Sequence, residues 1–358
     1  MARRRLARSW IKKGAVVVFL FCDKQNAPTY SGMTKIKDSI QATSNKPKEK
    51  YQVKNWREYN KALVSRGSIT LWLSEEVIAS WYYQGERQPG GAVKYSEACM
   101  ICLLSIKSLF RLGFRQTQGF GASLIKRLDL GIVVPSYSQI CRRQASLSVP
   151  IRVRNLAVGC QGLHIVVDST GLKVYGEGEW KTRVHGISKR RTWRKLHLAV
   201  DEKTSDLLAV ELTTNAVDDA QMVEDLVKQI ESVVDKFGGD GAYDKVKVYD
   251  YLESEGIIPI IPPREDAIVW TDNEGNDLQH PRNAAVLGIE EKGSAEWKKQ
   301  SGYHRRSKAE VAMFRYKTIF GPKTYARKMI NQQTEVRIKC ACINKFNLLG
   351  MPISVRVA

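Results

Sequence analysis

Apolar runs that alternate with helix-like segments in the second half of the chain place the strongest constraint on its fold. The apolar runs lie within residues 163–167, 193–200, 207–212 and 257–261. Runs in which β-branched residues join other apolar ones fit strands that are covered on both faces of a sheet. Helical patterns cover residues 218–234, 245–255 and 303–318. Three strands in sequence, followed by alternation of helix and strand, predict a mixed α/β sheet.

The first half of the chain has a helical pattern instead. Residues 56–112 follow this pattern, which a Pro-Gly-Gly segment interrupts within residues 85–91. Two shorter helices are predicted at about 116–128 and 136–145, and the second contains Arg142 and Arg143. A short pair with a basic second helix is typical of a helix-turn-helix, whose second helix enters the major groove of DNA. A helical pair that only packs remains the alternative.

A large excess of positive charge indicates a polyanionic partner. The 57 Lys and Arg residues against 37 Asp and Glu give a formal net charge of +20. Nucleic acid is the simplest partner for such a chain. A membrane surface would satisfy the same charge, but the basic residues are spread through the whole chain instead of lying on one amphipathic helix. We therefore expect nucleic acid and no membrane.

The N-terminal region and the cysteines favour a cytoplasmic protein. The apolar run at 15–22 is far shorter than the roughly 20 residues that span a bilayer, and no cleavage pattern follows it. We expect residues 1–50 to be a basic, flexible extension, with Met33 as a possible start. The seven cysteines are odd in number and irregularly spaced, so a disulfide framework is not expected. Cys99 and Cys102 have zinc-like spacing but lie in an apolar run, which favours buried thiols.

Three acidic residues are candidates for a functional site. Two follow predicted strands, and the third lies in a predicted helix. Asp168 ends the first apolar run, and the Ser-Thr-Gly that follows it suggests a turn. Asp240 lies in a glycine-flanked turn, after a segment at 234–239 that is less apolar than a central strand usually is. Glu310 lies in the predicted helix at 303–318.

Glu310 shares one stripe of its predicted helix with three other polar residues. At about 100° per residue, Tyr303, Arg306 and Lys317 project from the same side of the helix as Glu310. In a groove that holds DNA, Arg306 and Lys317 would contact phosphates and Tyr303 would pack or donate a hydrogen bond.

Three carboxylates on different elements of a basic chain fit metal-dependent phosphodiester chemistry. Mg²⁺, or Mn²⁺ in its place, takes oxygen ligands. Two ions roughly 3.5–4 Å apart activate the attacking oxygen and stabilise the leaving one. We expect Asp168, Asp240 and Glu310 to be both catalytic residues and metal ligands, with Asp168 bridging the two ions. Taken singly, each acid could instead cap a turn or pair with a neighbouring base.

Two other acids are expected to be structural. Asp201 ends the second predicted strand, and Asp244 could N-cap the helix that begins at Lys245. His185, His197, His280 and His304 have no spacing typical of metal ligands.

A dense basic segment lies between the first two acids. Its cationic residues are Lys181, Arg183, Lys189, Arg190, Arg191, Arg194 and Lys195. A charge run is usually a solvated face, but beside a metal site, and with Trp193 among the charges, it is better placed to hold phosphates. We expect these residues to contact DNA.

Several motifs in the same order resemble one known family. They are DSTGLK at 168–173, GEGEWK at 176–181, RRTWRKLHLAVD at 190–201, DGAYD at 240–244, IPPR at 261–264, Y-x2-R-x3-E-x6-K at 303–317 and GMPISVRVA at 350–358. From about Lys54 to the C-terminus the chain resembles the bacterial insertion-sequence DDE transposases, insertion-sequence family five. The resemblance implies a ribonuclease-H-like (retroviral-integrase-like) mixed-sheet catalytic core, preceded by an α-helical DNA-binding region. It also implies that Asp168, Asp240 and Glu310 form the catalytic triad.

The resemblance implies a function and a division of the chain. We expect a transposase that binds the terminal inverted repeats of its element, cuts DNA with two Mg²⁺ ions and joins the ends to target DNA, as a homodimer in the synaptic complex. Trp270 and Trp297 could stack on an unpaired base near the cut. The expected parts are the extension 1–50, the helical region 51–150, the catalytic domain 151–325 with a polar insertion at about 265–301, and a C-terminal helix and tail at 326–358. An inactive DNA-binding copy or repressor, and a ribonuclease-H-like nuclease without strand transfer, are the alternatives.

Overall fold

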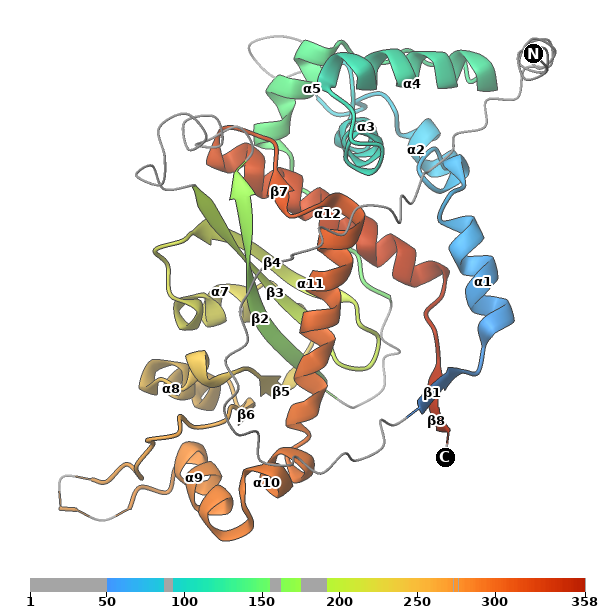
Figure 1. Ribbon diagram of the computed structural model, residues 1–358. Helices are drawn as coiled ribbons and strands as arrows, with labels where there is room; N and C mark the ends of the chain where they lie inside the picture. Colours follow the sequence, from blue (N-terminus) through green and yellow to red (C-terminus); the bar gives the residue numbers. More distant parts are fainter. Residues whose placement is uncertain are drawn as a thin grey trace, which may run out of the picture. The chain divides into compact units, whose positions relative to one another are not determined.

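The computed structural model describes residues 50–86, 93–154, 162–174, 192–272, 274–275 and 277–357 (Figure 1). Residues 51–357 belong to one compact unit. The predicted flexible extension, apart from Lys50, lies outside the described residues, as do the predicted DNA contacts Lys181, Arg183, Lys189, Arg190 and Arg191.

A mixed sheet forms the centre of the described structure and confirms the predicted fold class at that level. Its strands are β2 (Leu163–Val174), β3 (Trp193–Asp201), β4 (Leu207–Thr214), β5 (Val234–Gly238), β6 (Ile258–Ile260) and β7 (Lys323–Thr324). The order is β4-β3-β2-β5-β6, and β7 pairs with the far end of β2. β3 runs antiparallel to β2 and β4, whereas β5 is parallel to β2 and β6 is parallel to β5.

Strand β2 is longer than the sequence pattern predicts. The strand does not end before Asp168 but continues to Val174, so Asp168 lies in mid-strand and the predicted turn at Ser-Thr-Gly is wrong. Pairing with β3 along this whole stretch satisfies the backbone. Gly171 is suited to its place because the Trp193 ring lies beside it, and a Cβ there would stand 3.2 Å from the ring.

Strand β5 forms even though its sequence is only partly apolar. Val234, Phe237 and Gly238 are buried, and the strand is hydrogen-bonded between β2 and β6. Gly238 lets the strand pack closely, since a Cβ there would stand 3.1 Å from Val166. The segment at 218–234, predicted as one helix, divides into η4 (Asp219–Met222) and α7 (Val223–Val227) and then enters β5. Val233 and Val234 favour a strand at that point.

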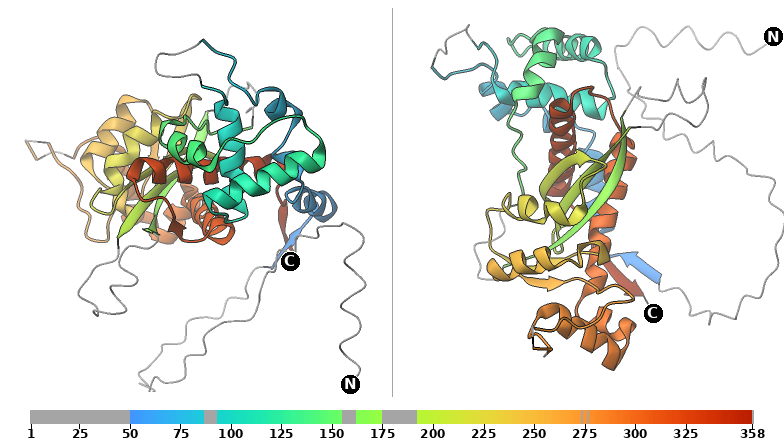
Figure 2. Two further views of the ribbon diagram at one scale, coloured as in Figure 1. Left: turned by 90° about the horizontal axis from the view of Figure 1, so that it is seen from above. Right: turned by 90° about the vertical axis from the view of Figure 1, so that its left-hand side faces the viewer.

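Two apolar clusters cover the two faces of the sheet, as the alternation of side chains along a strand requires. Val166 and Leu172 of β2 face a cluster that includes residues of α3 (Glu97–Leu109), α11 (Ser307–Phe320) and α12 (Met329–Leu349). Ile165 and Val167 face the opposite cluster, to which α7 and α8 (Val246–Ser254) contribute. The right-hand view of Figure 2 shows the sheet between these two layers of helices.

The remaining elements of the described chain are further helices and a second, small sheet. The other helices are α1 (Trp56–Ser65), α2 (Glu75–Ala79), α4 (Phe114–Leu128), α5 (Tyr137–Arg143), α9 (Pro281–Lys292) and α10 (Ser294–Gln300). The other 3-10 helices are η1 (Ile69–Leu71), η2 (Gln144–Ser146), η5 (Gly241–Tyr243) and η6 (Tyr303–Arg306). The terminal strands β1 (Lys50–Val53) and β8 (Ser354–Val357) pair in a small separate sheet. No helix of the described residues is long and apolar enough to cross a membrane.

Helices α4 and α5 coincide closely with the predicted pair at 116–128 and 136–145. Helix α5 begins with a capping box in which Ser136 accepts a bond from the Gln139 amide and the Gln139 side chain accepts one from the Ser136 amide.

Cys99 and Cys102 are buried thiols within α3. Burial raises the pKa of Cys102 to about 12, so it is protonated at neutral pH.

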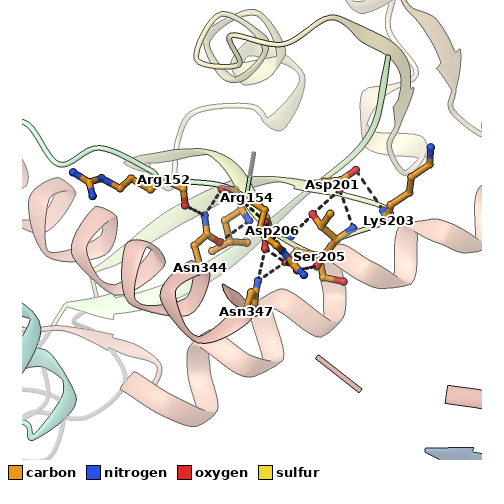
Figure 3. Close-up of polar contacts among 10 residues, drawn as sticks. Arg152, Arg154, Asp201, Lys203, Ser205, Asp206, Asn344 and Asn347 are labelled. Carbon is orange, nitrogen blue, oxygen red and sulfur yellow. Dashed lines mark hydrogen bonds and ion pairs between the residues drawn. The ribbon is translucent and has the colours of Figure 1, made fainter. Parts of the chain in front are cut away.

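Helix α12 covers the edge strand β4 with buried amide side chains. The Asn344 side chain accepts a bond from the Leu207 amide and donates one to the Leu207 carbonyl, each at 2.8 Å. Asn347 donates to the Ser205 carbonyl and to Asp206, which also pairs with Arg154 at 3.2 Å (Figure 3). These bonds satisfy backbone groups that an edge strand would otherwise leave unpaired. Helix α12 is therefore fixed to the sheet by polar contacts as well as by apolar packing.

Candidate active site

The three predicted acids converge although long stretches of chain separate them. Asp168 lies in the middle of β2, and Asp240 follows the adjacent parallel strand β5. Glu310 lies in the first turn of α11, which packs on the face of β2 that carries Val166. Because side chains alternate along a strand, Asp168 projects from that same face.

One arginine joins the three acids. The Arg306 guanidinium lies 3.5 Å from Asp168 Oδ2, 3.9 Å from Asp240 Oδ2 and 2.5 Å from Glu310 Oε1. Asp168 and Arg306 have 17% and 22% of their side chains exposed, whereas Glu310 has 55% exposed. The cluster is therefore partly open to solvent, and a large ligand can reach it from the side of Glu310.

Backbone amides orient the two aspartates. Asp168 Oδ1 accepts a bond from the Ser169 amide at 2.8 Å, and Asp240 Oδ1 accepts one from the Ala242 amide at 2.9 Å. In both residues the other carboxylate oxygen, Oδ2, is the one that faces Arg306. The structure thus directs one oxygen of each aspartate toward a common point.

Burial raises the pKa of Asp168 above its ordinary value. The Ser169 amide and Arg306 act in the opposite direction, and the charges of Asp240 and Glu310 add to the increase. The Arg306 charge therefore favours the ionised form of Asp168, against the effect of burial.

The predicted polar stripe is present, but its first part is not α-helical. Tyr303 and Arg306 belong to the 3-10 helix η6, and α11 begins only at Ser307, so the prediction of one continuous α-helix is wrong. The Tyr303 ring lies 5.9 Å from the Arg306 guanidinium. Lys317 donates a 2.6 Å hydrogen bond to Thr170 Oγ1. Thr170 lies two residues after Asp168 in β2, so Lys317 lies on the same face of the sheet as the three acids.

Two contacts that the sequence analysis missed hold η6 and Lys317 beside the acids. Glu202, after β3, pairs with Arg305 of η6 at 3.3 Å and with His164 of β2 at 2.6 Å. Thr170, read from the sequence as part of a turn, is the acceptor for Lys317. Extending the strand past Asp168 would have identified Thr170 by its alternation with Asp168, but no local signal marks Glu202.

The turn after β5 is held by the tyrosine of the DGAYD motif. Tyr243 is buried, and its ring packs edge-on against Phe237 at 5.8 Å between centroids. Gly239 has to be small, because a Cβ there would stand 2.8 Å from the Tyr243 ring. This packing fixes the backbone from which Asp240 projects.

The two acids expected to be structural have structural contacts. Asp201 accepts bonds from the amide and hydroxyl of Thr204 in the turn between β3 and β4. Asp244 does not N-cap α8, where Lys245 occupies the N-cap position, so that prediction is wrong. Its carboxylate is instead buried and pairs with Arg282 at 2.8 Å. The buried cation attracts Asp244 more strongly than a helix terminus does.

The described members of the basic segment are separate from the acids. Lys195 lies opposite Gly171 in the sheet, so it projects from the face opposite to Asp168, and it donates to Asp219 and to the Val217 carbonyl. Arg194 lies on the same face as Asp168 but bonds to Gln332 of α12 at 2.9 Å. The structure does not bring either residue into the acidic cluster.

Arg142, one of the two predicted basic residues of α5, borders a shallow groove of about 560 Å³. The groove is lined by Gly113, Phe114, Arg115, Gln116, Tyr137, Ser138, Cys141 and Arg142. Arg115 stacks on the Tyr137 ring at 4.7 Å, which leaves it and Arg142 on the same side of the helix pair. Arg143 is turned away and donates to the Tyr95 carbonyl.

The two tryptophans of the predicted insertion have different surroundings. Trp270 contacts Tyr249, His280 and the Arg282 guanidinium, the last at 4.3 Å. The Trp297 ring lies 6.3 Å from the ring of Tyr303, which is next to the Arg306 guanidinium. Trp297 is therefore the tryptophan whose ring neighbours a residue of the candidate site, Tyr303.

Comparisons with known proteins identify the family to which the chain belongs. A family described as transposase DDE domain matches residues 159–345, just over half of the chain, and a second family with the same description matches residues 64–177. The chain belongs to the DDE transposases. A solved structure, the piggyBac transposase synaptic complex with hairpin DNA, matches over 80% of this chain and 76% of that one at 12% sequence identity. Its TM-score of 0.35 is too low to bear on the fold or function of this chain.

The residue types of the acidic cluster fit a divalent cation. DDE transposases generally use divalent metal ions, and Asp168, Asp240 and Glu310 supply the carboxylate oxygens that such ions take. In the described part of the chain, however, no group of three or more His, Cys, Asp or Glu side chains is spaced to hold an ion. The Arg306 guanidinium lies between the three acids.

Proposed function

We propose that this DNA transposase cuts DNA at the ends of an insertion sequence and joins those ends to target DNA, with Asp168, Asp240 and Glu310 as its catalytic triad. The convergence of these three acids on Arg306 is the observation that supports the proposal most strongly. The mixed sheet, with one acid in β2 and another directly after β5, is compatible with a ribonuclease-H-like core. Membership of insertion-sequence family five rests on the motifs of the sequence.

The triad residues would hold Mg²⁺ or Mn²⁺, as two ions. When bound, these cations would supply charge neutralisation and Lewis acidity at the phosphodiester. The protein's part is to hold the oxygens in place. Asp168 is fixed by a strand that is paired on both sides, and Asp240 is fixed by its bond to the Ala242 amide.

The reaction has two displacement steps at phosphorus. In the first, a water oxygen bonds to phosphorus, the bond from phosphorus to the 3′-oxygen breaks, and the element end leaves with a free 3′-hydroxyl. In the second, this hydroxyl attacks a phosphodiester of target DNA and displaces a target strand. Arg306 and Lys317 are suited to contact the flanking phosphates, because both lie on the face of the sheet that carries Asp168. No covalent enzyme intermediate is needed.

We assign DNA recognition to the helical region 51–150 and catalysis to residues 151–325, with residues 326–358 as a C-terminal helix and tail. The groove between α4 and α5, with Arg115 and Arg142 beside it, supports contact with the terminal repeats in the first region. The basic residues at 181–191, together with Arg194 and Lys195, would contact DNA phosphates. Pairing of two element ends implies a homodimer in the synaptic complex, and the reaction would occur in the cytoplasm.

The test is cleavage and joining of labelled DNA that carries the element's own end, in Mg²⁺ or Mn²⁺. The wild type should nick the end and form joined products, and Asp168→Asn should do neither. Asp235→Asn is the matched control, because Asp235 is an exposed aspartate on β5 outside the cluster. Binding without cleavage by the wild type would favour an inactive copy or repressor, and cleavage without joining would favour a nuclease.

A further inference from the structure

Among the described residues, the acidic cluster carries more negative charge than Arg306 alone can balance. Three carboxylates face one guanidinium, and the contacts at 2.5, 3.5 and 3.9 Å use an oxygen from each acid. In Asp168 and Asp240 the second oxygen is already bonded to a backbone amide. That amide engages one lone pair of the second oxygen, so in both aspartates the oxygen that faces Arg306 is the more open to a bound cation once the guanidinium moves.

A divalent cation and the Arg306 guanidinium would compete for the same oxygens. The guanidinium contacts one oxygen of each acid, so a metal ion cannot take those three oxygens while the guanidinium lies between them. The guanidinium would have to move before the acids could close around a metal ion.

We propose that Arg306 is the counter-cation of the triad in the DNA-free protein and moves to a DNA phosphate on binding, so that DNA and divalent metal strengthen each other's binding. This inference rests on the proposed function. A phosphate is a strong alternative partner for arginine, because its oxygens accept two parallel bonds from the guanidinium fork. DNA would thus remove the cation that blocks the metal.

The surroundings of Arg306 allow its side chain to move while the backbone stays in place. Arg306 lies on η6, and the neighbouring Arg305 anchors that helix to Glu202 at 3.3 Å. Glu202 is itself tied to His164 of β2 at 2.6 Å. Arg306 has 22% of its side chain exposed and is bordered by the Tyr303 ring at 5.9 Å. Its guanidinium can therefore reach solvent without unfolding of η6.

The linkage has a thermodynamic consequence that binding measurements can detect. If DNA raises the affinity for metal by some factor, metal raises the affinity for DNA by the same factor. Coupling between sites typically amounts to about 5- to 150-fold in affinity. Removing the Arg306 charge should raise the metal affinity of the free protein and abolish most of this coupling.

The experiment titrates Mn²⁺ into the full-length protein without DNA, with bound and free Mn²⁺ distinguished by electron paramagnetic resonance. Arg306→Gln should bind Mn²⁺ about fivefold more tightly than the wild type, or tighter still. Lys299→Gln is the matched control, because it removes one positive charge from α10, the helix that precedes η6, where Lys299 has 77% of its side chain exposed and lies 3.9 Å from Glu296. It should bind Mn²⁺ as the wild type does.

A second titration adds duplex DNA that carries the element's own end, with the scissile phosphate replaced by a non-cleavable analogue. This duplex should tighten Mn²⁺ binding to the wild type by about fivefold or more and should change Arg306→Gln much less. Thermal unfolding, with and without Mn²⁺, checks that Arg306→Gln is folded, and Mn²⁺ should stabilise this variant more than the wild type.

The outcomes separate this inference from the proposed function. Mn²⁺ binding that is lost in Asp168→Asn but unchanged in Arg306→Gln would overturn the linkage and leave the triad intact. Equal tightening in Lys299→Gln and Arg306→Gln would also overturn the linkage, because it would show a general effect of charge. Absence of Mn²⁺ binding in the wild type and in Arg306→Gln, with or without DNA, would overturn both proposals.

Discussion

At the scale of single residues, Asp240 and Asp244 belong to the same short motif but lie in different surroundings. Asp240 is 37% exposed and faces Arg306, whereas Asp244 is 2% exposed and pairs with Arg282. The sequence distinguished these two acids by motif position, but it could not show the partner of Asp244, because Arg282 is distant along the chain and no local pattern links the two.

This difference predicts opposite effects for two matched substitutions. Asp244→Asn should lower the free energy of unfolding by about 3 kcal/mol, because it leaves the buried Arg282 without a counter-charge. Folded molecules of that variant should still cut DNA. Asp240→Asn should change stability by less than about 1 kcal/mol, since asparagine also caps η5, and should abolish cleavage. Urea unfolding and a cleavage assay on each variant measure both quantities, and loss of cleavage in folded Asp244→Asn would contradict the assignment.

A buried histidine predicts a specific dependence of stability on pH. His197 is fully buried, and burial lowers its pKa to about 4 even though Asp219 lies 3.5 Å away and acts in the opposite direction. The unfolded chain takes up a proton below about pH 6.5, and the folded protein does so only near pH 4. The contribution of neutral His197 to stability is therefore complete above pH 6.5 and is lost as the pH falls toward 4.

The measurement compares urea unfolding of the wild type and His197→Gln across this pH range. The difference between their free energies of unfolding should shrink by on the order of 2 to 3 kcal/mol between pH 7 and pH 4. Parallel curves for the two proteins would show that His197 does not titrate in this way.

At the scale of elements, strand pairing overrides local sequence signals. The Ser-Thr-Gly after Asp168 is typical of a turn, yet β2 continues to Val174 because β3 pairs with it throughout. Similarly, β5 is a central strand despite its polar Asp235 and Lys236, since β2 and β6 bind it on both sides. Turn residues and polarity are local signals, whereas the partners of a strand come from distant parts of the chain.

We expect the protein to lose measurable stability when the contact between helix α12 and the edge strand β4 is removed. Asn344 is buried and bonds to the amide and carbonyl of Leu207 and to the Arg152 carbonyl. Asn344→Ala should lower the free energy of unfolding by about 2 to 4 kcal/mol, because it leaves buried backbone groups of β4 unpaired. Leu348→Ala on the same helix is the control, since Leu348 is 50% exposed. Leu348→Ala should change the free energy of unfolding by about 0.5 kcal/mol. Equal losses for the two variants in urea unfolding would contradict the role of Asn344.

At the scale of the whole molecule, the sequence identified the mixed sheet and the three acids that the structure brings together. Motif order and the alternation of apolar runs carried that information. The sequence did not reveal that Arg306 bridges all three acids, because its position on the stripe equally suited a phosphate contact. It also missed helices α9 and α10 in the insertion, whose polar surface hides their periodicity.

The central claim is that Asp168, Asp240 and Glu310 act as one catalytic unit on DNA. The most direct test is a gel assay of cleavage and joining at the element end. It compares Asp168→Asn, Asp240→Asn and Glu310→Gln with the wild type, at protein concentrations that bind the same fraction of the DNA. The account predicts that each substitution alone abolishes both products. When residues act as a unit, losing one of them costs about as much activity as losing all of them. Cleavage at a rate near that of the wild type by any one of the three variants would contradict this prediction.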